Sequence, residues 1–262
     1  MSGHTLGVVS VAVCHGRLVT SALDSTIRVF DLSRGDATMT ADINVSAMHL
    51  WETCFTPDGT HIVAAGGSGS TLDLFTSPTS SSASTSLALS NRVPLYTDGA
   101  TPPDKQFALS VACSPDGKKA AVGCMDGTVA VVDLATQRTI HLMRHHVKPV
   151  RTVRFTHDGR HILSGSDDAY INMCDVGSGE LVHGFSGHAS WVLSLDVHPE
   201  ETVMVSGGAD HQVKLWDLQT RSCMQTETMH QGYVWSTRFS PDGKRLASAG
   251  EDGCVCVYAI SR

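Results

Sequence analysis

An aspartate that recurs along the chain marks an internal repeat. Aligning the segments SALDSTIRVFD, MDGTVAVVD, SDDAYINMCD, GADHQVKLWD and GEDGCVCVYA places Asp24, Asp126, Asp168, Asp210 and Asp252 in one column. The last four of these residues follow one another every 42 residues. A further unit, GGSGSTLDLFT, fits between the first two aspartates, with Gly69 at the aspartate position. A period of this length indicates one structural unit repeated six times.

Every unit has the same order of apolar and polar residues. An alternating stretch such as WVLSLDV is followed by a turn such as SPDG, a second stretch such as RLASAG, an Asp-centred turn and a third stretch such as QVKLWDL. A weaker fourth stretch such as RSCMQTETM completes the unit. Alternation with a period of two residues, closed by Asp-Gly turns, is typical of β-strands in hairpins. The chain shows no useful helical pattern, so the sequence predicts four-stranded antiparallel sheets.

The units carry Gly-His before and Trp-Asp after their strands at a period of about 40 to 45 residues, and in this they resemble the WD-repeat family over nearly the whole chain. The resemblance implies an all-β fold, a WD-repeat β-propeller with six recognisable four-stranded repeats in a single domain. The approximate repeats are 1–34, 35–78, 99–136, 137–178, 179–220 and 221–262. A Ser/Thr/Pro-rich insert covers about 76–104, and we expect it to hold an outer strand, in SLALS or RVPLY, with solvated loop around it.

The resemblance also bears on the number of blades. Members of the family most similar to this chain are expected to have seven, whereas this sequence starts at the first Gly-His turn and ends after a third strand. We therefore expect six repeats of a seven-bladed ring whose N-terminal blade is missing. A six-bladed ring, or one closed by a partner, is the alternative. On either interpretation the last sheet is expected to have three strands, and an open sheet edge favours pairing with other chains.

Composition excludes several classes of function. The 19 Lys and Arg are outnumbered by 26 Asp and Glu, giving a net charge of −7, so we expect no direct binding of nucleic acid. No apolar run is long enough to cross a membrane, so no membrane partner is expected. The eight cysteines form no CxxC pair, and the 14 histidines lack a ligand-like spacing. We therefore expect reduced thiols, no metal site and no cofactor.

In the repeat 186–218 the resemblance implies a buried hydrogen-bonded set of four side chains, Trp216, Ser206, His188 and Asp210. An indole N–H donates, a hydroxyl and a neutral imidazole both donate and accept, and a carboxylate accepts. Such a set leaves no buried polar atom unpaired and fixes two strands to a loop. The corresponding structural residues in other repeats are His4, Thr20 and Asp24; His146, Ser164 and Asp168; and His230, Ser248 and Asp252.

The same residue types form hydrolytic triads, and the other repeats test that alternative. Phe30, Cys174 and Tyr258 replace the tryptophan in the first, fourth and sixth repeats. The third repeat reads Asp104, Val122, Asp126 and Val132, and the second reads Ser46, Ala65, Gly69 and Phe75. A catalytic site does not tolerate such losses, whereas a scaffold with six copies does. We therefore expect no catalytic residue and no enzyme.

Function is then expected on exposed residues at the ends of the sheets. The third residue after the histidine column is Gly7, His49, Phe107, Pro149, Trp191 or Tyr233, and the fifth is Val9, Trp51, Leu109, Arg151, Leu193 or Trp235. In the family both positions resemble those that open onto the narrow face around the central channel. We predict that Trp51, Phe107, Arg151, Trp191, Tyr233 and Trp235 bind a protein partner. The alternative is that some of these rings cap the channel and pack on their neighbours.

Several repeats are similar to those of the WD-repeat subunits of the superkiller complex. The similarity is carried by GHTLGVVSVAV, SALDSTIRVFDL, FALSVACSPDGKKAAVGCMDG and TRSCMQTETMHQGYVWSTRFSPDGKRLASAGEDG. Those subunits are non-enzymatic and join a helicase to a tetratricopeptide scaffold for exosome-mediated mRNA decay. In several eukaryotes they also belong to the polymerase-associated factor (Paf) complex in transcription elongation. The resemblance implies protein partners in these two complexes, and a cytoplasmic and nuclear location.

A WD-repeat substrate receptor or adaptor of a ubiquitin ligase is the alternative. The signature of such receptors has an arginine two residues after the aspartate of the WD pair. This chain has Ser33, Ala135, Gly177 and Gln219 at those positions. The substitutions weaken this alternative.

Overall fold

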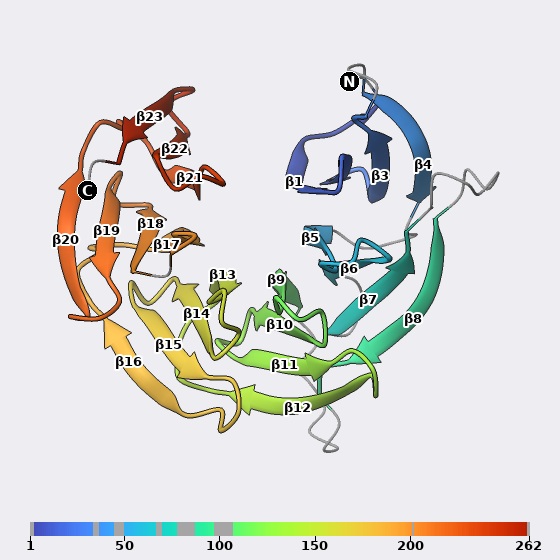
Figure 1. Cartoon of the computed structure of the whole chain (residues 1–262), viewed down its shortest axis with the longest axis horizontal. Coiled ribbons are helices and arrows are strands. Elements are labelled where there is room, and N and C mark those ends of the chain that lie inside the picture. The colour runs from blue at the N-terminus through green and yellow to red at the C-terminus, as the bar shows by residue number, and fades with distance from the viewer. Residues whose placement is uncertain are drawn as a thin grey trace. The chain divides into compact units, whose positions relative to one another are not determined.

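The computed structural model describes residues 3–33, 37–44, 50–66, 70–77, 87–96, 107–200 and 202–260. All regular secondary structure in these ranges is β-strand, arranged in six antiparallel sheets (Figure 1). The chain divides into two compact units. Unit 1 comprises Met1–Cys124 and Ala130–His141, and unit 2 comprises Met125–Val129 and Leu142–Arg262.

Unit 1 contains the first two sheets and most of the third. Sheet 1 consists of β1 (Val8–Cys14), β2 (Arg17–Ala22), β3 (Thr26–Asp31) and β4 (Thr38–Asn44). Sheet 2 consists of β5 (Leu50–Phe55), β6 (His61–Gly66), β7 (Thr71–Thr76) and β8 (Ala88–Pro94). Sheet 3 consists of β9 (Ala108–Cys113), β10 (Lys119–Cys124), β11 (Val129–Asp133) and β12 (Arg138–Met143). The outer strand expected in the insert is β8, which overlaps both SLALS and RVPLY.

Unit 2 contains the other three sheets. Sheet 4 consists of β13 (Val150–Phe155), β14 (His161–Ser166), β15 (Ile171–Asp175) and β16 (Leu181–Phe185). Sheet 5 consists of β17 (Val192–Val197), β18 (Val203–Gly208), β19 (Val213–Asp217) and β20 (Ser222–Glu227). Sheet 6 consists of β21 (Val234–Phe239), β22 (Arg245–Gly250) and β23 (Val255–Ala259). Within the described ranges, sheet 6 has three strands and each of the other sheets has four.

The Asp-Gly turns join the first and second strands of four sheets. Gly59, Gly117, Gly159 and Gly243 have φ of 68, 70, 69 and 67°, a backbone conformation that glycine adopts at little cost. In each turn a hydroxyl donates to the aspartate carboxylate two residues later, from Thr56 to Asp58, Ser114 to Asp116, Thr156 to Asp158 and Ser240 to Asp242. These contacts close the hairpins that the alternating sequence predicts.

Neighbouring sheets within each unit bury their apolar faces against one another. In unit 1 one core cluster includes Val19 of sheet 1 and Phe55 and Phe75 of sheet 2. In unit 2 another includes Phe185 of sheet 4 and Trp216 of sheet 5. The alternation of apolar side chains therefore supplies a buried layer between sheets 1 and 2 and another between sheets 4 and 5.

Small residues let the first strand of one sheet approach the previous sheet closely. A Cβ atom at Gly165 would lie 2.6 Å from Cγ1 of Val192, and one at Gly207 would lie 2.6 Å from Cγ1 of Val234. Beside Gly207, the Ser194 hydroxyl accepts a hydrogen bond from the Thr237 backbone N–H at 2.9 Å. Sheets 4 and 5 thus each receive a valine from the next sheet, and this packing fixes where β17 and β21 begin.

Candidate functional site

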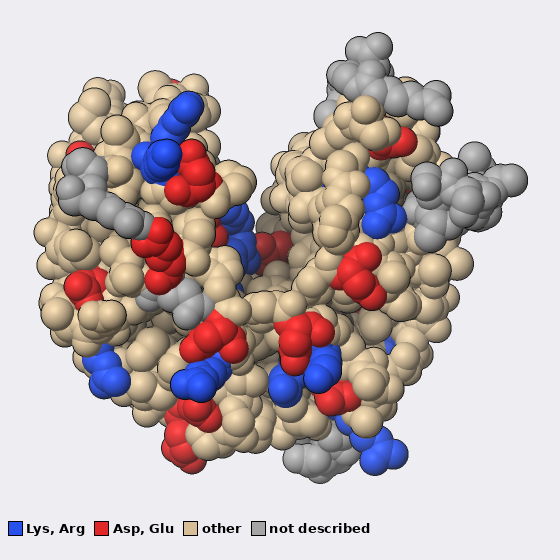
Figure 2. Space-filling model, viewed as in Figure 1, with Lys and Arg blue, Asp and Glu red and all other residues tan. Residues whose placement is uncertain are grey.

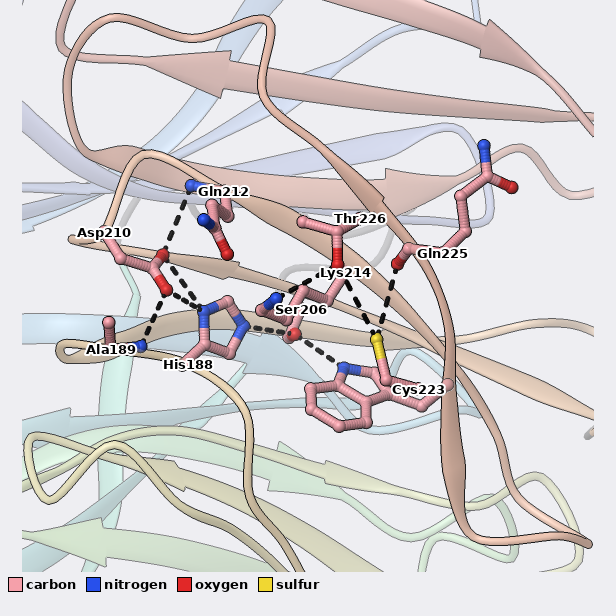
Figure 3. A network of polar contacts seen from close by, with 10 residues as sticks. His188, Ala189, Ser206, Asp210, Gln212, Lys214, Cys223, Gln225 and Thr226 are labelled. Carbon is pink, nitrogen blue, oxygen red and sulfur yellow. Dashed lines mark hydrogen bonds and ion pairs between the residues drawn. The ribbon is translucent and has the colours of Figure 1, made fainter.

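The polar side chains predicted in repeat 186–218 form a continuous hydrogen-bonded set in sheet 5 (Figure 3). Trp216 Nε1 donates to the Ser206 hydroxyl at 2.8 Å, and Ser206 Oγ lies 2.6 Å from His188 Nε2. His188 Nδ1 lies 2.9 Å from a carboxylate oxygen of Asp210. With a neutral imidazole, Nδ1–H donates to the carboxylate and Nε2 accepts from the serine, so every polar atom of the set has a partner.

The carboxylate of Asp210 holds the loop before β17 as well as the imidazole. It accepts backbone N–H groups from Ala189 at 2.9 Å and Gln212 at 3.2 Å. Burial raises the pKa of Asp210, but the hydrogen bonds and charge of His188, together with those two N–H groups, hold the pKa below its usual value. Asp210 is therefore ionised at neutral pH and joins the loop to the turn between β18 and β19.

The same contacts recur in sheets 1, 4 and 6 without the tryptophan. The His Nε2 to hydroxyl distance is 2.8 Å for His4 and Thr20, 2.9 Å for His146 and Ser164, and 2.7 Å for His230 and Ser248. The His Nδ1 to carboxylate distance is 3.2 Å for His4 and Asp24, 2.9 Å for His146 and Asp168, and 3.0 Å for His230 and Asp252. In sheet 6 the Ser248 hydroxyl also lies 3.4 Å from the Tyr258 hydroxyl.

Sheets 2 and 3 lack this set among the residues that the structure describes. Ala65 and Val122 are buried apolar residues at the hydroxyl position. Asp126 accepts from the backbone N–H and the hydroxyl of Thr128, both at 2.9 Å, and so closes its own turn. The other predicted members, Ser46, Gly69 and Asp104, lie outside the described residues.

The hydrogen-bonded set of sheet 5 is sealed from solvent. Ser206 has no exposed surface, and the side chain of His188 is also fully buried. A serine nucleophile must reach a substrate carbonyl, and its base must be free to take the proton. Ser206 fails the first condition, because it is fully buried and its oxygen accepts a hydrogen bond from Trp216. The arrangement can fasten strands to loops, and it offers no surface to a substrate.

The fifth residue after each histidine is placed by a β-bulge. The register of the first strand shifts at this residue in all six sheets, between Val8 and Ser10 in sheet 1 and at the equivalent pairs elsewhere. The extra residues are Val9, Trp51, Leu109, Arg151, Leu193 and Trp235. A bulge turns one side chain out of the regular alternation. Sequence reasoning found this column but not the bulges, since one extra residue leaves the apolar pattern nearly unchanged.

The third residue after each histidine lies at the same end of the sheet as the His–Asp contact. The backbone carbonyl oxygens of Gly7, Pro149, Trp191 and Tyr233 accept hydrogen bonds of 2.8 to 3.0 Å from the N–H of Leu23, Asp167, Ala209 and Glu251. Each donor directly precedes the aspartate of its repeat. These bonds place Trp191 and Tyr233 at one end of the unit 2 sheets, which we call the loop end.

At the loop end of unit 2 an arginine lies between a carboxylate and an aromatic ring. Arg151 Nε and a terminal nitrogen of its guanidinium donate to the two oxygens of Asp167 at 2.8 and 2.7 Å. The guanidinium carbon of the same residue lies 5.4 Å from the ring centroid of Trp191 in the next sheet. This is a bidentate ion pair combined with a cation–π contact. Asp167 is a functional candidate that sequence reasoning missed, although it precedes the repeated aspartate in SDDAY.

Tyr233 and Trp235 form an aromatic pair on sheet 6. Their ring centroids are 5.7 Å apart and the rings are inclined at 73°. The imidazole of His211, in the turn of sheet 5, lies 5.9 Å from the Tyr233 ring. Trp191 and Trp235 are 41% and 53% exposed. The structure therefore brings Arg151 and Trp191 together, and Tyr233 and Trp235 together, with much of both indoles open to solvent.

Trp51 and Phe107 form the corresponding pair in unit 1. Their rings stack at a centroid distance of 6.4 Å with planes inclined by 10°, and both residues are half-buried. Like Arg151, Trp51 is the fifth residue after the histidine position of its repeat. Like Trp191, Phe107 is the third residue after that position in the next repeat. These two rings bury part of their apolar surface on each other. This agrees with the alternative interpretation, in which some of the rings pack on their neighbours.

Further apolar side chains at the loop end of unit 2 were not predicted from the sequence. Val147 follows the column histidine and is 85% exposed, Tyr170 lies in the turn before β15, and Met229 precedes the column histidine of sheet 6. The contact between His146 and Asp168 places the loop of Val147 beside the turn of Tyr170. These residues lie next to or near the repeated histidines and aspartates, so comparing those neighbouring positions between repeats would identify them from the sequence.

Charged groups on the surface are mixed in sign. Figure 2 shows acidic and basic side chains interspersed on the face in view, with no extended basic area. In the described ranges no group of three or more His, Cys, Asp or Glu could hold a metal ion. No helix in those ranges is long and apolar enough to cross a membrane.

Two family models match the chain. Residues 179–217 and 221–259 match the model described as WD domain, G-beta repeat, and residues 9–194 match the model described as Nucleolar protein 10-like, N-terminal domain. Sheets 5 and 6, which carry two of the complete His–Ser–Asp contacts, therefore fall in the WD matches, and the second model covers more than half of the chain.

Curated relatives are WD-repeat proteins. The chain is 38% identical over 161 residues to the WD repeat-containing protein VIP3 of Arabidopsis thaliana, a match that covers 59% of this chain and 48% of the relative. It is 32% identical over 156 residues to the WD repeat-containing protein SL1-17 of Schistosoma mansoni, which covers 59% of this chain and 46% of the relative. The matches thus span about half the length of these relatives.

A solved structure with the same fold is the β-propeller domain of Myceliophteria thermophila Cps50 (Swd1). The TM-score is 0.83 at 15% sequence identity, and the match covers 99% of this chain and 85% of that one. This likeness confirms the predicted all-β propeller class, and the six predicted repeats correspond to the six sheets described above.

Proposed function

The chain belongs to the β-propellers of the nucleolar protein 10-like family, with WD repeats in its last two blades, and on this premise we propose that it is a non-catalytic scaffold that binds protein partners within a multiprotein complex. Propellers of this kind serve as interaction surfaces, and their function depends on the residues that they expose. The buried state of the His, Ser and Asp side chains supports a scaffold, since they fasten strands to loops within each blade and are closed to substrate.

The observation that carries the proposal is the apolar surface at the loop end of unit 2. Val147, Tyr170, Trp191, Met229 and Trp235 are all exposed there, on loops and strand starts joined by the His–Asp contacts. Exposed aromatic side chains held on a rigid sheet are typical anchors of protein interfaces, because burying them on a partner yields a large apolar contribution at low entropic cost. We therefore assign partner binding to this end of unit 2.

The partners that we propose are subunits of the superkiller complex, its helicase and its tetratricopeptide scaffold, or subunits of the Paf complex. The segments quoted above support this choice by their similarity to the corresponding WD-repeat subunits, and the relatives that match are themselves WD-repeat proteins. The proposed roles are exosome-mediated mRNA decay and transcription elongation. A location in both cytoplasm and nucleus follows from these roles as part of the proposal.

Affinity capture followed by mass spectrometry tests this function. The baits are the wild-type chain, the double variant Trp191→Ala/Trp235→Ala, and a matched control, Leu181→Ala/Met224→Ala, which removes two apolar side chains exposed on the outer strands β16 and β20. We expect superkiller or Paf subunits with the wild type and the control, and their loss with the tryptophan variant. Equal recovery with all three baits would place the binding surface elsewhere. Recovery of neither complex would show that the proposed partners are wrong.

A further inference from the structure

We infer that Cys54 and Cys113 form a modification site, at which a hydroperoxide oxidises the two thiols to a disulfide that joins sheets 2 and 3. The inference goes beyond the proposed scaffold function, because it concerns a covalent change inside unit 1. It rests on the contact between the two sulfur atoms, on the residues at equivalent positions of the other sheets, and on the hydrogen bonds that sheets 2 and 3 lack.

The two sulfur atoms are in contact across the junction between two sheets. Cys54 lies on β5 of sheet 2, and Cys113 is the last residue of β9 of sheet 3. Their Sγ atoms are 3.4 Å apart, and both thiols are free and half-buried. A disulfide bond is about 2.05 Å long, so the sulfurs need to approach by about 1.4 Å to form one. They are therefore close enough to react with each other and partly open to a small oxidant.

Cysteine occurs at the first of these positions only in sheet 2 and at the second only in sheet 3. By register, the residues equivalent to Cys54 are Ala12, Ala112, Arg154, Asp196 and Arg238, and those equivalent to Cys113 are Val13, Phe55, Phe155, Val197 and Phe239. The equivalent positions of sheets 5 and 6 also meet, since the Phe239 backbone N–H donates to the Asp196 carboxylate at 2.7 Å. The stacking of first strands thus brings these two positions together, and sheets 2 and 3 place a thiol at each.

Sheets 2 and 3 are the sheets whose described residues lack the His, hydroxyl and Asp set. Ala65 and Val122 replace the hydroxyl residue there. A covalent bond between β5 and β9 would therefore join two sheets that have no such hydrogen bonds of their own. The bond between Cys54 and Cys113 would close a loop of about 60 residues in the unfolded chain, and this lowers the conformational entropy of the unfolded state. We expect oxidation to stabilise this pair of sheets.

The oxidation proceeds in two steps. The hydrogen bond with Cys54 and burial raise the pKa of Cys113, so Cys113 keeps its proton and donates it to the Cys54 sulfur, which reacts first. The Cys54 thiolate attacks a peroxide oxygen, so that an S–O bond forms, the O–O bond breaks, the sulfur is oxidised to a sulfenic acid, and the peroxide is reduced to water or an alcohol. The Cys113 sulfur then attacks the Cys54 sulfur, so that the S–S bond forms, the S–O bond breaks, and water leaves with the Cys113 proton. A small thiol reverses the bond by exchange.

The test treats the purified, reduced full chain with hydrogen peroxide. Four proteins are compared: the wild type, Cys54→Ser, Cys113→Ser, and the matched control Cys223→Ser, which removes an exposed thiol of β20. Free thiols are blocked with N-ethylmaleimide, and peptide mass spectrometry without reductant identifies linked cysteines. In the wild type and Cys223→Ser we expect a bond between Cys54 and Cys113, and a thermal unfolding midpoint that rises by about 5 °C or more and returns to its starting value with dithiothreitol. Neither change is expected in Cys54→Ser or Cys113→Ser.

The wild type alone decides whether the site exists, even if a serine variant does not fold. Peroxide that oxidises the exposed Cys223 while Cys54 and Cys113 stay unlinked would overturn the modification site. A bond between them that leaves the unfolding midpoint unchanged would overturn the stabilisation of sheets 2 and 3.

Dimedone, which traps sulfenic acids, tests the order of the two steps. We expect it to label Cys54 in Cys113→Ser. Label on Cys113 in Cys54→Ser, with none on Cys54 in Cys113→Ser, would overturn that order. All of these results are independent of the docking surface of unit 2, which the capture experiment tests.

Discussion

The Ser206 hydroxyl accepts a hydrogen bond from Trp216 and donates one to His188, and the residue has no exposed surface that a substrate could reach. Trp191, only three residues after that histidine, is 41% exposed. Residues that are close in sequence therefore differ in role because of burial, and not because of residue type. The repeated columns predicted which side chains meet in the buried set, whereas Asp167 could not be recognised without knowing that a bulge places Arg151 beside it.

Ser206→Ala is expected to lower the free energy of unfolding by about 1–3 kcal/mol, because it leaves the indole N–H of Trp216 and Nε2 of His188 buried without a partner. Urea unfolding followed by circular dichroism measures the loss. The control Ser222→Ala changes an exposed serine of β20 and should stay within about 0.5 kcal/mol of the wild type. Unchanged stability of Ser206→Ala would contradict a structural role for the set.

Lowering the pH below about 6.5 is expected to destabilise the protein through His146. Burial lowers the pKa of His146, and the Asp168 carboxylate only partly opposes this. The unfolded chain then binds a proton on this residue at a higher pH than the folded chain does, so the contribution of His146 is present above about pH 6.5 and is lost as the pH falls. Urea midpoints between pH 7.5 and 5.5 should fall less steeply in His146→Gln than in the wild type or in His157→Gln, a change at an exposed histidine. Equal slopes in all three would refute this role.

At the level of elements, sheets 4 and 5 each offer the next sheet a site at a small residue. Gly207 and Ser194 of sheet 5 receive Val234 and Thr237 of sheet 6. The outward face of sheet 6 lacks such a cover among the described residues, since Val255 and Val257 are 70% and 64% exposed. By register Val255 pairs with Ala249 as Val213 pairs with Gly207, so these two valines occupy equivalent places in covered and uncovered sheets.

Because the two valines are equivalent in register but differ in exposure, a lysine should lower the free energy of unfolding strongly at Val213 and hardly at all at Val255. Val213→Lys should cost more than about 3 kcal/mol or prevent folding, because Val213 is 1% exposed and the ammonium would be buried without a partner. Val255→Lys should change the free energy of unfolding by less than about 0.5 kcal/mol. Chemical denaturation of both variants provides the measurement. A large loss in Val255→Lys would show that the outward face of sheet 6 is covered.

Strands and their turns were predictable because period-two alternation and Asp-Gly pairs act locally. The strand in the insert shows the limit of such reasoning. Two segments fitted an outer strand equally well, and β8 overlaps both because pairing with β7 selects its register. The bulges of the first strands were missed for a related reason, since they depend on how a strand meets its neighbour.

At the scale of the whole molecule, the repeat predicted the propeller class, which the Cps50 (Swd1) likeness confirms at only 15% identity. Repetition specifies a fold through many equivalent contacts. Apolar residues can therefore replace the hydroxyl residue in single repeats, as Ala65 and Val122 do, without loss of the propeller fold. Partners are not predictable in this way, because they depend on a few exposed residues that differ from blade to blade. The relatives are WD-repeat proteins, and the matches span about half of their length.

The most direct test of the account is the dissociation constant of the purified chain for a partner segment recovered by capture, measured by isothermal titration calorimetry. Trp191→Ala/Trp235→Ala should weaken binding by about 100-fold or more, because buried tryptophan anchors typically contribute about 2 kcal/mol or more each. The control Leu181→Ala/Met224→Ala, on the outer strands, should bind within about twofold of the wild type. An unchanged dissociation constant for a folded tryptophan variant would contradict partner binding at the loop end of unit 2.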